Sequence, residues 1–130
     1  MSVDVIGNFL TSIRNGIAAS RRYVEVPHSN MKEQIAKILK DEGFIVDYMI
    51  TGEGALKGLK VVLKYKGPES VIHEITRVST PGHRTYGGYK GIRPVVGGLG
   101  VTILSTSRGL MTNKEAKKLS VGGEIVCTVW

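Results

Sequence analysis

Cysteine, histidine and long apolar runs are scarce in this 130-residue chain. The single cysteine, Cys127, excludes an intramolecular disulfide and a cysteine-based metal site. The three histidines, His28, His73 and His83, share no ligand spacing, so we expect no histidine metal site. No run approaches the roughly 18 apolar residues that a membrane-spanning helix needs, and the first residues do not resemble a signal peptide. These absences predict a soluble protein without a metal or another cofactor.

Catalytic motifs are also lacking. There is no G-x-S-x-G elbow, and no pair of carboxylates has a sequence setting typical of acid–base catalysis. Gly82 and Gly87 have the spacing of a phosphate-binding loop, but Gly88 and Tyr89 stand where lysine and serine or threonine are required. We therefore predict that the chain is not an enzyme. An active site assembled only by folding stays as the alternative.

Basic residues are in excess. Lys and Arg number 18 against 11 Asp and Glu, which gives a formal net charge of +7. Cations that neutralise phosphates release condensed counterions, so this excess favours a nucleic-acid partner. An anionic membrane or an acidic ligand would satisfy the charge as well.

Glycine is unevenly distributed, with 6 residues in 1–66 and 11 in 67–130, out of 17 in the chain. The shift predicts an α+β N-terminal domain over 1–66 and a mainly antiparallel β C-terminal domain with a short helix over 67–130. Gly67-Pro68 marks the expected junction.

Apolar spacing predicts the elements of the N-terminal domain. In chain order these are a helix over 4–19, a strand over 23–26, a helix over 30–42, and a hairpin of two strands over 44–51 and 59–66. Asp4 is expected to cap the first helix. Asn30 and Glu33 have capping-box spacing at the front of the second helix, and Gly43 should end it.

The runs that predict strands and helices are shorter in the C-terminal domain. Its expected elements are strands over 71–79, 101–104 and 125–130, a helix over 112–119, and a turn at Gly122-Gly123. Thr112 and Glu115 have capping-box spacing at the start of that helix.

The strongest local feature follows the strand at 101–104. It is a hydroxyl-rich, basic corner made of Ser105, Thr106, Ser107, Arg108 and Gly109. Short hydroxyls can donate to and accept from base edges and the 2′-OH of RNA, while an arginine can meet a phosphate. The competing interpretation is a strand-to-helix turn whose hydroxyls cap the next element, and local physics does not separate the two.

Basic and aromatic residues alternate in a second cluster, which suits stacking on bases and contact with phosphates. Its members are Arg77, His83, Arg84, Tyr86, Tyr89, Lys90 and Arg93. An exposed hairpin with core tyrosines is the competing interpretation. Weaker candidates lie on or just beyond the two N-terminal helices, where charges usually form a solvated face: Arg14, Arg21, Arg22, Lys32, Lys37 and Lys40.

Several runs together resemble the bacterial form of the small-subunit ribosomal protein eight family. These runs are Asp4 with Leu10, Thr11, Ile13, Arg14 and Asn15; 35–40 with 42–45; 77–79 with Pro81 and Gly82; 100–117 with its Ser-Thr-Ser-Arg-Gly loop; and 122–125. The resemblance spans the whole chain, and the loop motif is its most specific part.

This resemblance implies a two-domain ribosomal protein of the cytoplasm, or of a plastid, that binds the central domain of small-subunit rRNA directly and helps assembly. It implies that the main contact is the loop Ser105–Arg108, supported by Tyr86 and Glu124. Lesser contacts are implied near Asp4, Thr11 and Arg14. Other small-subunit proteins are the implied neighbours, and repression of the protein's own operon mRNA through the same surface is the alternative role.

Overall fold

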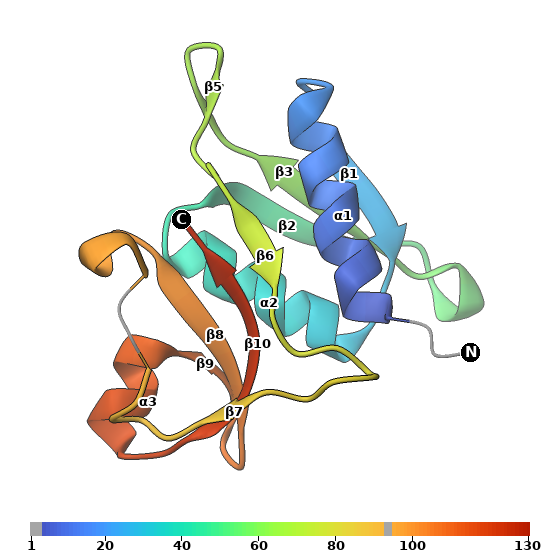
Figure 1. Ribbon diagram of the computed structural model, residues 1–130. Helices are drawn as coiled ribbons and strands as arrows, with labels where there is room; N and C mark the ends of the chain where they lie inside the picture. Colours follow the sequence, from blue (N-terminus) through green and yellow to red (C-terminus); the bar gives the residue numbers. More distant parts are fainter. Residues whose placement is uncertain (1–3, 93–94) are drawn as a thin grey trace. The chain divides into compact units, whose positions relative to one another are not determined.

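The computed structural model describes residues 4–92 and 95–130. The chain divides into two compact units, and the division falls inside the first helix. We call Asn8–Ile72 the N-terminal unit, and Met1–Gly7 with His73–Trp130 the C-terminal unit. The elements confirm the predicted α+β class, with a helix-and-strand first part and a mainly antiparallel β second part (Figure 1).

The N-terminal unit contains two helices and a three-stranded antiparallel sheet. Its elements are α1 (Val5–Ala18), β1 (Tyr23–Pro27), α2 (Asn30–Asp41), β2 (Ile45–Thr51), the 3-10 turn η1 (Gly54–Leu56), β3 (Gly58–Leu63), and the small hairpin β4 (Tyr65–Lys66) and β5 (Glu69–Ser70). The sheet order is β1-β3-β2, so β1 and β2 are its edges. Gly16 lets α1 approach β1 and β3, because a Cβ there would clash with Val24 and press on Leu63.

The helix ends explain where α1 and α2 begin and stop. Asp4 caps α1 as predicted, since its Oδ1 accepts from the N–H of Gly7 at 3.0 Å. The predicted cap at Asn30 is wrong: Ser29 caps α2 and accepts from the N–H of Lys32, which leaves Asn30 as the first helical residue. Gly43, at φ +80°, ends α2 as predicted.

Two strand predictions in this part of the chain were too long. The strand expected to reach residue 66 ends at Leu63, and Gly67 with Pro68 forms the turn between β4 and β5. The strand expected over 71–79 is a regular strand only over Ile75–Arg77. Beyond Arg77, the backbone N–H groups of Val78 and Ser79 still donate to the carbonyls of Val126 and Ile125.

The C-terminal unit is built on one antiparallel sheet and a short helix. Its elements are β6 (Ile75–Arg77), β7 (Tyr86–Gly87), the 3-10 turn η2 (Val95–Gly98), β8 (Val101–Thr106), β9 (Gly109–Thr112), α3 (Asn113–Leu119) and β10 (Gly123–Val129). The order is β6-β10-β8-β9, with β7 also pairing with β10. A buried cluster of Leu104, Met111 and Ala116, joined by Ile92, Val121 and Ile125, holds α3 against one face of this sheet.

Candidate nucleic-acid interface

The hydroxyl-rich corner is the tip of a β-hairpin. β8 ends at Thr106 and β9 begins at Gly109, so Ser107 and Arg108 form a two-residue connection. The strand-to-helix turn considered from the sequence is therefore wrong, because β9 intervenes before α3. Gly109 has φ +102°, a conformation that disfavours any side chain and closes the turn.

The Thr106 hydroxyl holds this turn together. Its Oγ1 accepts from the N–H of Arg108 at 3.1 Å and donates to the carbonyl of Gly109 at 2.9 Å. A side chain that accepts from the backbone two residues ahead mimics one turn of backbone hydrogen bonding. Thr106 is thus a structural residue of the tip as well as a candidate contact.

Ser107 and Arg108 project from the tip. Both are exposed, and within the described part of the chain the Ser107 hydroxyl has no hydrogen-bond partner. A hydroxyl with an unused donor and unused acceptors, beside a guanidinium, can meet a polar base edge and a phosphate together. Both polar side chains of the tip are therefore accessible to a ligand.

Register in the sheet brings three other predicted residues beside the tip. Tyr86 lies opposite Glu124, and Glu124 lies opposite Ser105. Directly opposite residues of antiparallel strands point to the same face, so these three side chains form one row across β7, β10 and β8. Tyr86 is 69% exposed. Far-apart sequence positions thus form one polar surface that carries an aromatic ring.

Glu124 is the centre of this row and is held in place by two donors. Its Oε1 accepts from the buried Ser79 hydroxyl at 3.0 Å and from Nη1 of Arg84 at 3.0 Å. Ser79 in turn accepts from the N–H of Thr85 at 3.1 Å. The carboxylate side chain is only 20% exposed. Glu124 therefore orients Arg84 and the strand that bears Tyr86.

Two glycines let the strands of the row approach closely. A Cβ at Gly122 would lie 2.6 Å from the Gly87 carbonyl oxygen, and one at Gly123 would clash with the Ser105 carbonyl. The sequence predicted a turn at these residues, but Gly123 already belongs to β10. Their role is close packing of β7, β10 and β8 beneath the row.

Asp4 belongs to the same unit but has other partners. Besides capping α1, its carboxylate accepts from Nε of Arg77 at 3.3 Å. Nη1 of Arg77 donates to the carbonyl of Val126 at 2.8 Å. Asp4 therefore joins the start of α1 to the sheet, and its oxygens are already engaged.

Three predicted contact residues lie on helices of the N-terminal unit, Thr11 and Arg14 on α1 and Lys32 on α2. Thr11 and Arg14 are exposed on α1. Lys32 differs, because it is 7% exposed and its Nζ donates to the carbonyl of Pro27 at 2.8 Å. Burial lowers the pKa of Lys32. In this conformation Lys32 presents little charge to solvent.

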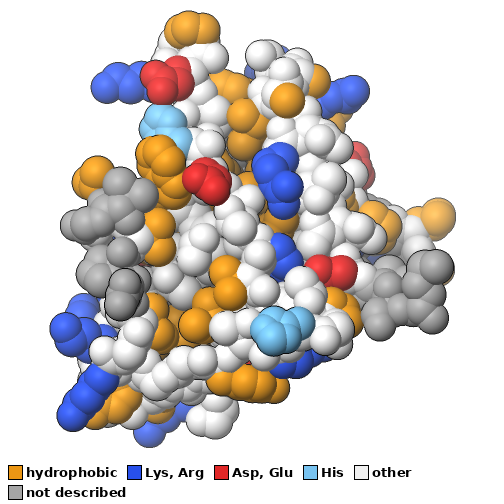
Figure 2. All heavy atoms as spheres, in the orientation of Figure 1, with side chains coloured by type: hydrophobic (Ala, Val, Ile, Leu, Met, Phe, Trp, Pro, Cys, Tyr) orange, Lys and Arg blue, Asp and Glu red, His pale blue; other side chains and the backbone are white. Residues whose placement is uncertain are grey.

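The second basic cluster is only partly assembled. Tyr89 and Lys90 line a hollow of about 480 Å³ together with Asn113, Lys114 and Lys117 of α3. In the view of Figure 2, blue side chains gather at lower left, where α3 lies in Figure 1. Sequence reasoning missed the two α3 lysines, although their spacing of three residues after a cap puts both on one helix face. Arg93, also in the predicted cluster, lies outside the described residues.

The described residues give no sign of other chemistry. Across 4–92 and 95–130 no group of three metal-ligating side chains occurs, and no helix there is long and apolar enough to cross a membrane. Cys127 is fully buried in β10, and desolvation raises the pKa of its thiol to about 12. It is a core residue.

Comparison with known proteins gives one consistent result. The family described as ribosomal protein S8 matches residues 4–130. The small ribosomal subunit protein uS8 of Phocaeicola vulgatus is 50% identical over 129 residues, covering 98% of both chains. The uS8 proteins of Synechocystis and Dictyoglomus thermophilum are 48% and 49% identical, over 99% and 98% of this chain and 98% and 97% of their own.

Proposed function

Because the chain belongs to the ribosomal protein S8 family, we propose that it binds small-subunit rRNA directly, in the central domain, and helps that domain assemble. It is a structural protein of the small ribosomal subunit and not an enzyme. Its place of action is the ribosome of the bacterial cytoplasm, or of a plastid. Other small-subunit proteins are its expected neighbours.

One observation supports the RNA proposal most strongly. The Ser107 hydroxyl, which has no partner among the described residues, belongs with the guanidinium of Arg108 to the hairpin tip, and the exposed Tyr86 belongs to the row beside it. RNA with splayed or non-canonical bases exposes polar edges, 2′-OH groups and π faces together. The surface has a complementary group for each.

Each residue then has its own part. Ser105 and Ser107 would read base edges or 2′-OH groups, and Tyr86 would stack on a base. Arg108 would meet a phosphate, while Arg84 is steadied by Glu124 for the same purpose. Thr106 and Gly109 hold the tip in shape.

Peripheral contacts complete the proposal. Thr11 and Arg14 are exposed and available to a sugar or phosphate of the same RNA. Asp4 would act through Arg77 and the start of α1, to which it is bonded. Lys32 ranks last, because it would first have to leave the Pro27 carbonyl.

The test compares two RNA stems of equal length. One is an internally looped stem from the central domain, and the other has the same ends with full Watson–Crick pairing. We expect binding to the looped stem to be tighter by at least about 100-fold at moderate salt, as specific sites exceed non-specific ones. Footprinting on whole small-subunit rRNA should protect the same stem. Equal binding to both stems would refute shape reading.

Repression of the protein's own operon mRNA is the second role to test. One surface would serve both RNAs, so an operon stem that mimics the ribosomal site should compete with it at the hairpin tip. Competition in a binding assay would support this role, and sedimentation with the small subunit measures the ribosomal one.

A further inference from the structure

Strand β1 is an outer strand of the three-stranded sheet in the N-terminal unit. Among residues 4–92 and 95–130 it pairs with β3 alone, with Tyr23 opposite Val62 and Glu25 opposite Lys60. Its other side is an edge, which in a small sheet presents backbone groups that another chain could pair with.

The hydrogen-bond pattern identifies which backbone groups face outward. Beyond both ends of β1, Leu63 donates to the carbonyl of Arg22 at 2.9 Å, and His28 donates to that of Lys57 at 3.1 Å. Antiparallel pairs alternate between bonded and non-bonded, so the even-numbered residues of β1 bond to β3. The N–H and C=O of Tyr23 and Glu25 therefore point away from the sheet. Among the described residues these four groups have no partner.

At each end of this edge the backbone groups are already hydrogen-bonded or lack a donor. At one end, the N–H of Arg21 donates to Gly16 at 2.9 Å and its carbonyl accepts from the Tyr65 hydroxyl at 2.6 Å. At the other end, Pro27 has no N–H, and its carbonyl accepts from Lys32. The open stretch is thus limited to the length from Tyr23 to Glu25. Lys32 and Tyr65 therefore lie at its two borders.

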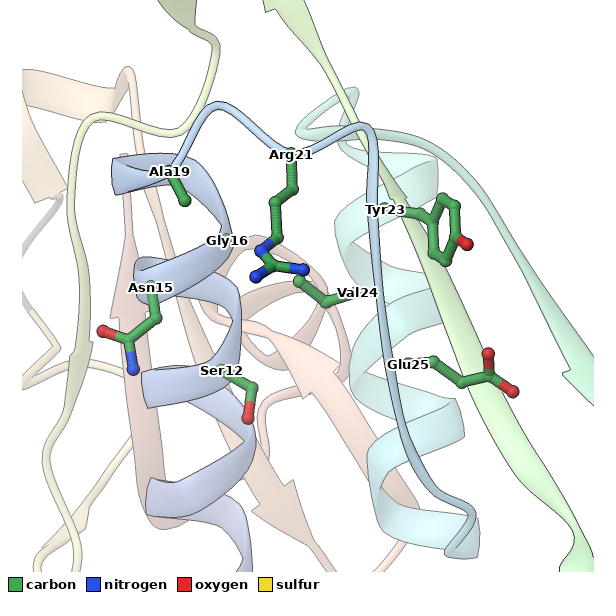
Figure 3. Close-up of a pocket in the computed structure, with 8 residues that line it drawn as sticks. All are labelled: Ser12, Asn15, Gly16, Ala19, Arg21, Tyr23, Val24 and Glu25. Atoms are coloured by element: carbon green, nitrogen blue, oxygen red, sulfur yellow. The ribbon is translucent and has the colours of Figure 1, made fainter.

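A groove runs beside the open stretch. It encloses about 630 Å³ between β1 and the face of α1 that carries Ser12, Asn15 and Ala19. Figure 3 shows the Arg21 side chain reaching into the space between helix and strand. The small side chains on the helix leave room for an extended backbone, and the guanidinium supplies a cation at one end of the groove.

We propose that a short extended peptide of another protein, carrying a carboxylate, adds to β1 as a fourth strand. Its backbone would pair with Tyr23 and Glu25, and its carboxylate would bind Arg21. This inference rests on the proposed function in one respect, the source of the peptide, which is another protein of the small ribosomal subunit.

An extended peptide fits this edge better than RNA does. The four outward groups are two donors and two acceptors in alternation, which is what a β-strand offers in return. A phosphate needs donors only, and the two outward carbonyls of Tyr23 and Glu25 would repel it. The guanidinium of Arg21 could bind a carboxylate or a phosphate, so the alternation of backbone donors and acceptors is what favours a peptide over RNA.

The experiment measures binding of the full chain to overlapping synthetic 15-residue peptides that cover the small-subunit ribosomal proteins of the same genome. For any peptide that binds, amide hydrogen exchange of Tyr23 and Glu25 is followed by NMR. We expect an acidic peptide to bind and to slow exchange at both amides by at least about tenfold, as backbone pairing requires. If no peptide in the set binds, the proposal is refuted.

Two pairs of variants locate the site. Glu25→Pro removes an outward N–H without removing a bond to β3, and Glu25→Gln is its matched control because it keeps the N–H. Arg21→Gln removes the guanidinium in the groove, and Arg22→Gln removes the neighbouring one outside it. We expect Glu25→Pro and Arg21→Gln each to weaken peptide binding at least about fivefold, with the controls within about twofold. If Glu25→Pro fails to fold, the exchange measurement on the unaltered chain still decides.

The looped RNA stem is measured in parallel with every variant. Unchanged stem affinity with lost peptide binding supports the proposal. Peptide binding that survives Glu25→Pro and Arg21→Gln, or stem affinity that falls while peptide binding persists, overturns it. Failure of the unaltered chain to prefer the looped stem would refute the proposed function and leave the peptide result standing.

Discussion

Thr106 and Ser107 are neighbours at the hairpin tip, but their hydroxyls have different surroundings. The Thr106 hydroxyl makes two hydrogen bonds inside the turn, whereas the Ser107 hydroxyl has none within the described residues. The two positions therefore separate the stability of the tip from its capacity to bind.

Alanine at each position should separate these roles. Ser107→Ala should leave the free energy of unfolding within about 0.5 kcal/mol and weaken binding to the looped stem by about 10- to 100-fold. Thr106→Ala should weaken binding too, and should also lower the free energy of unfolding by about 1 kcal/mol. Urea unfolding and stem titration measure the two effects. A Ser107→Ala variant that binds normally would remove Ser107 from the reading surface.

Lys32 raises a second residue-scale question, because this charged residue is only 7% exposed. Its folded-state pKa lies below the ordinary value of 10.5, so folding is opposed by the cost of burying the charge. Between the two pKa values the unfolded chain binds more protons. In that window, stability rises with pH.

The prediction compares the natural chain with Lys32→Met, which keeps the apolar stem. The free energy of unfolding of the natural chain, relative to the variant, should be constant near neutral pH and should rise as pH approaches 10.5. Urea unfolding at several alkaline pH values measures this. The same substitution at the exposed Lys37 of the same helix, Lys37→Met, is the matched control. A flat or falling difference for Lys32 would contradict the buried-charge argument.

At the scale of elements, three helices end in the same way. In each, a residue with positive φ follows the last turn: Ser20 at +53°, Gly43 at +80° and Ser120 at +55°. The next N–H along the chain bonds back to a carbonyl of the last turn in every case. Only α2 uses the residue that this conformation favours, since a side chain there costs about 1–2 kcal/mol.

Glycine should therefore stabilise the ends of α1 and α3. We expect Ser20→Gly and Ser120→Gly each to raise the free energy of unfolding by about 0.5 kcal/mol, because the larger entropy of glycine in the unfolded chain offsets part of the gain. Gly43→Ala should lower it by about 1 kcal/mol. Thermal and urea unfolding would measure all three. Loss of stability in both serine variants would mean that the hydroxyls make a compensating contribution.

The same elements show how far sequence patterns reach. Helices α1 and α2 were predicted within two residues, because their apolar periodicity is long and Asp4 and Gly43 mark their limits. Strands β7 and β9 were missed because two and four residues are too few for a period. The row of Tyr86, Glu124 and Ser105 depends on pairing between distant strands, which no local pattern contains. The hairpin tip itself was predicted as a site from its residue types and family resemblance.

For the whole molecule, the relevant property is charge. The net charge of +7 is spread over the chain, with 10 basic and 7 acidic residues in 1–66 and 8 and 4 in 67–130. Some of the basic side chains are paired with carboxylates within the fold, as in the pairs of Lys40 with Asp47 and Arg84 with Glu124. The exposed cations that meet phosphates are the ones that make binding depend on salt, because they replace counterions on RNA.

Salt dependence therefore distinguishes phosphate contacts from reading contacts. Arg14 is exposed on α1, so Arg14→Ala should weaken stem binding modestly and reduce the slope of log affinity against log salt by about 1. Ser107→Ala should weaken binding more and leave the slope unchanged, since a hydroxyl displaces no counterion. Titrations of the looped stem at four salt concentrations would measure both. If Arg14→Ala were the more damaging change, the main contact would lie on α1 instead of the hairpin tip, and the row beside that tip would be a supporting surface.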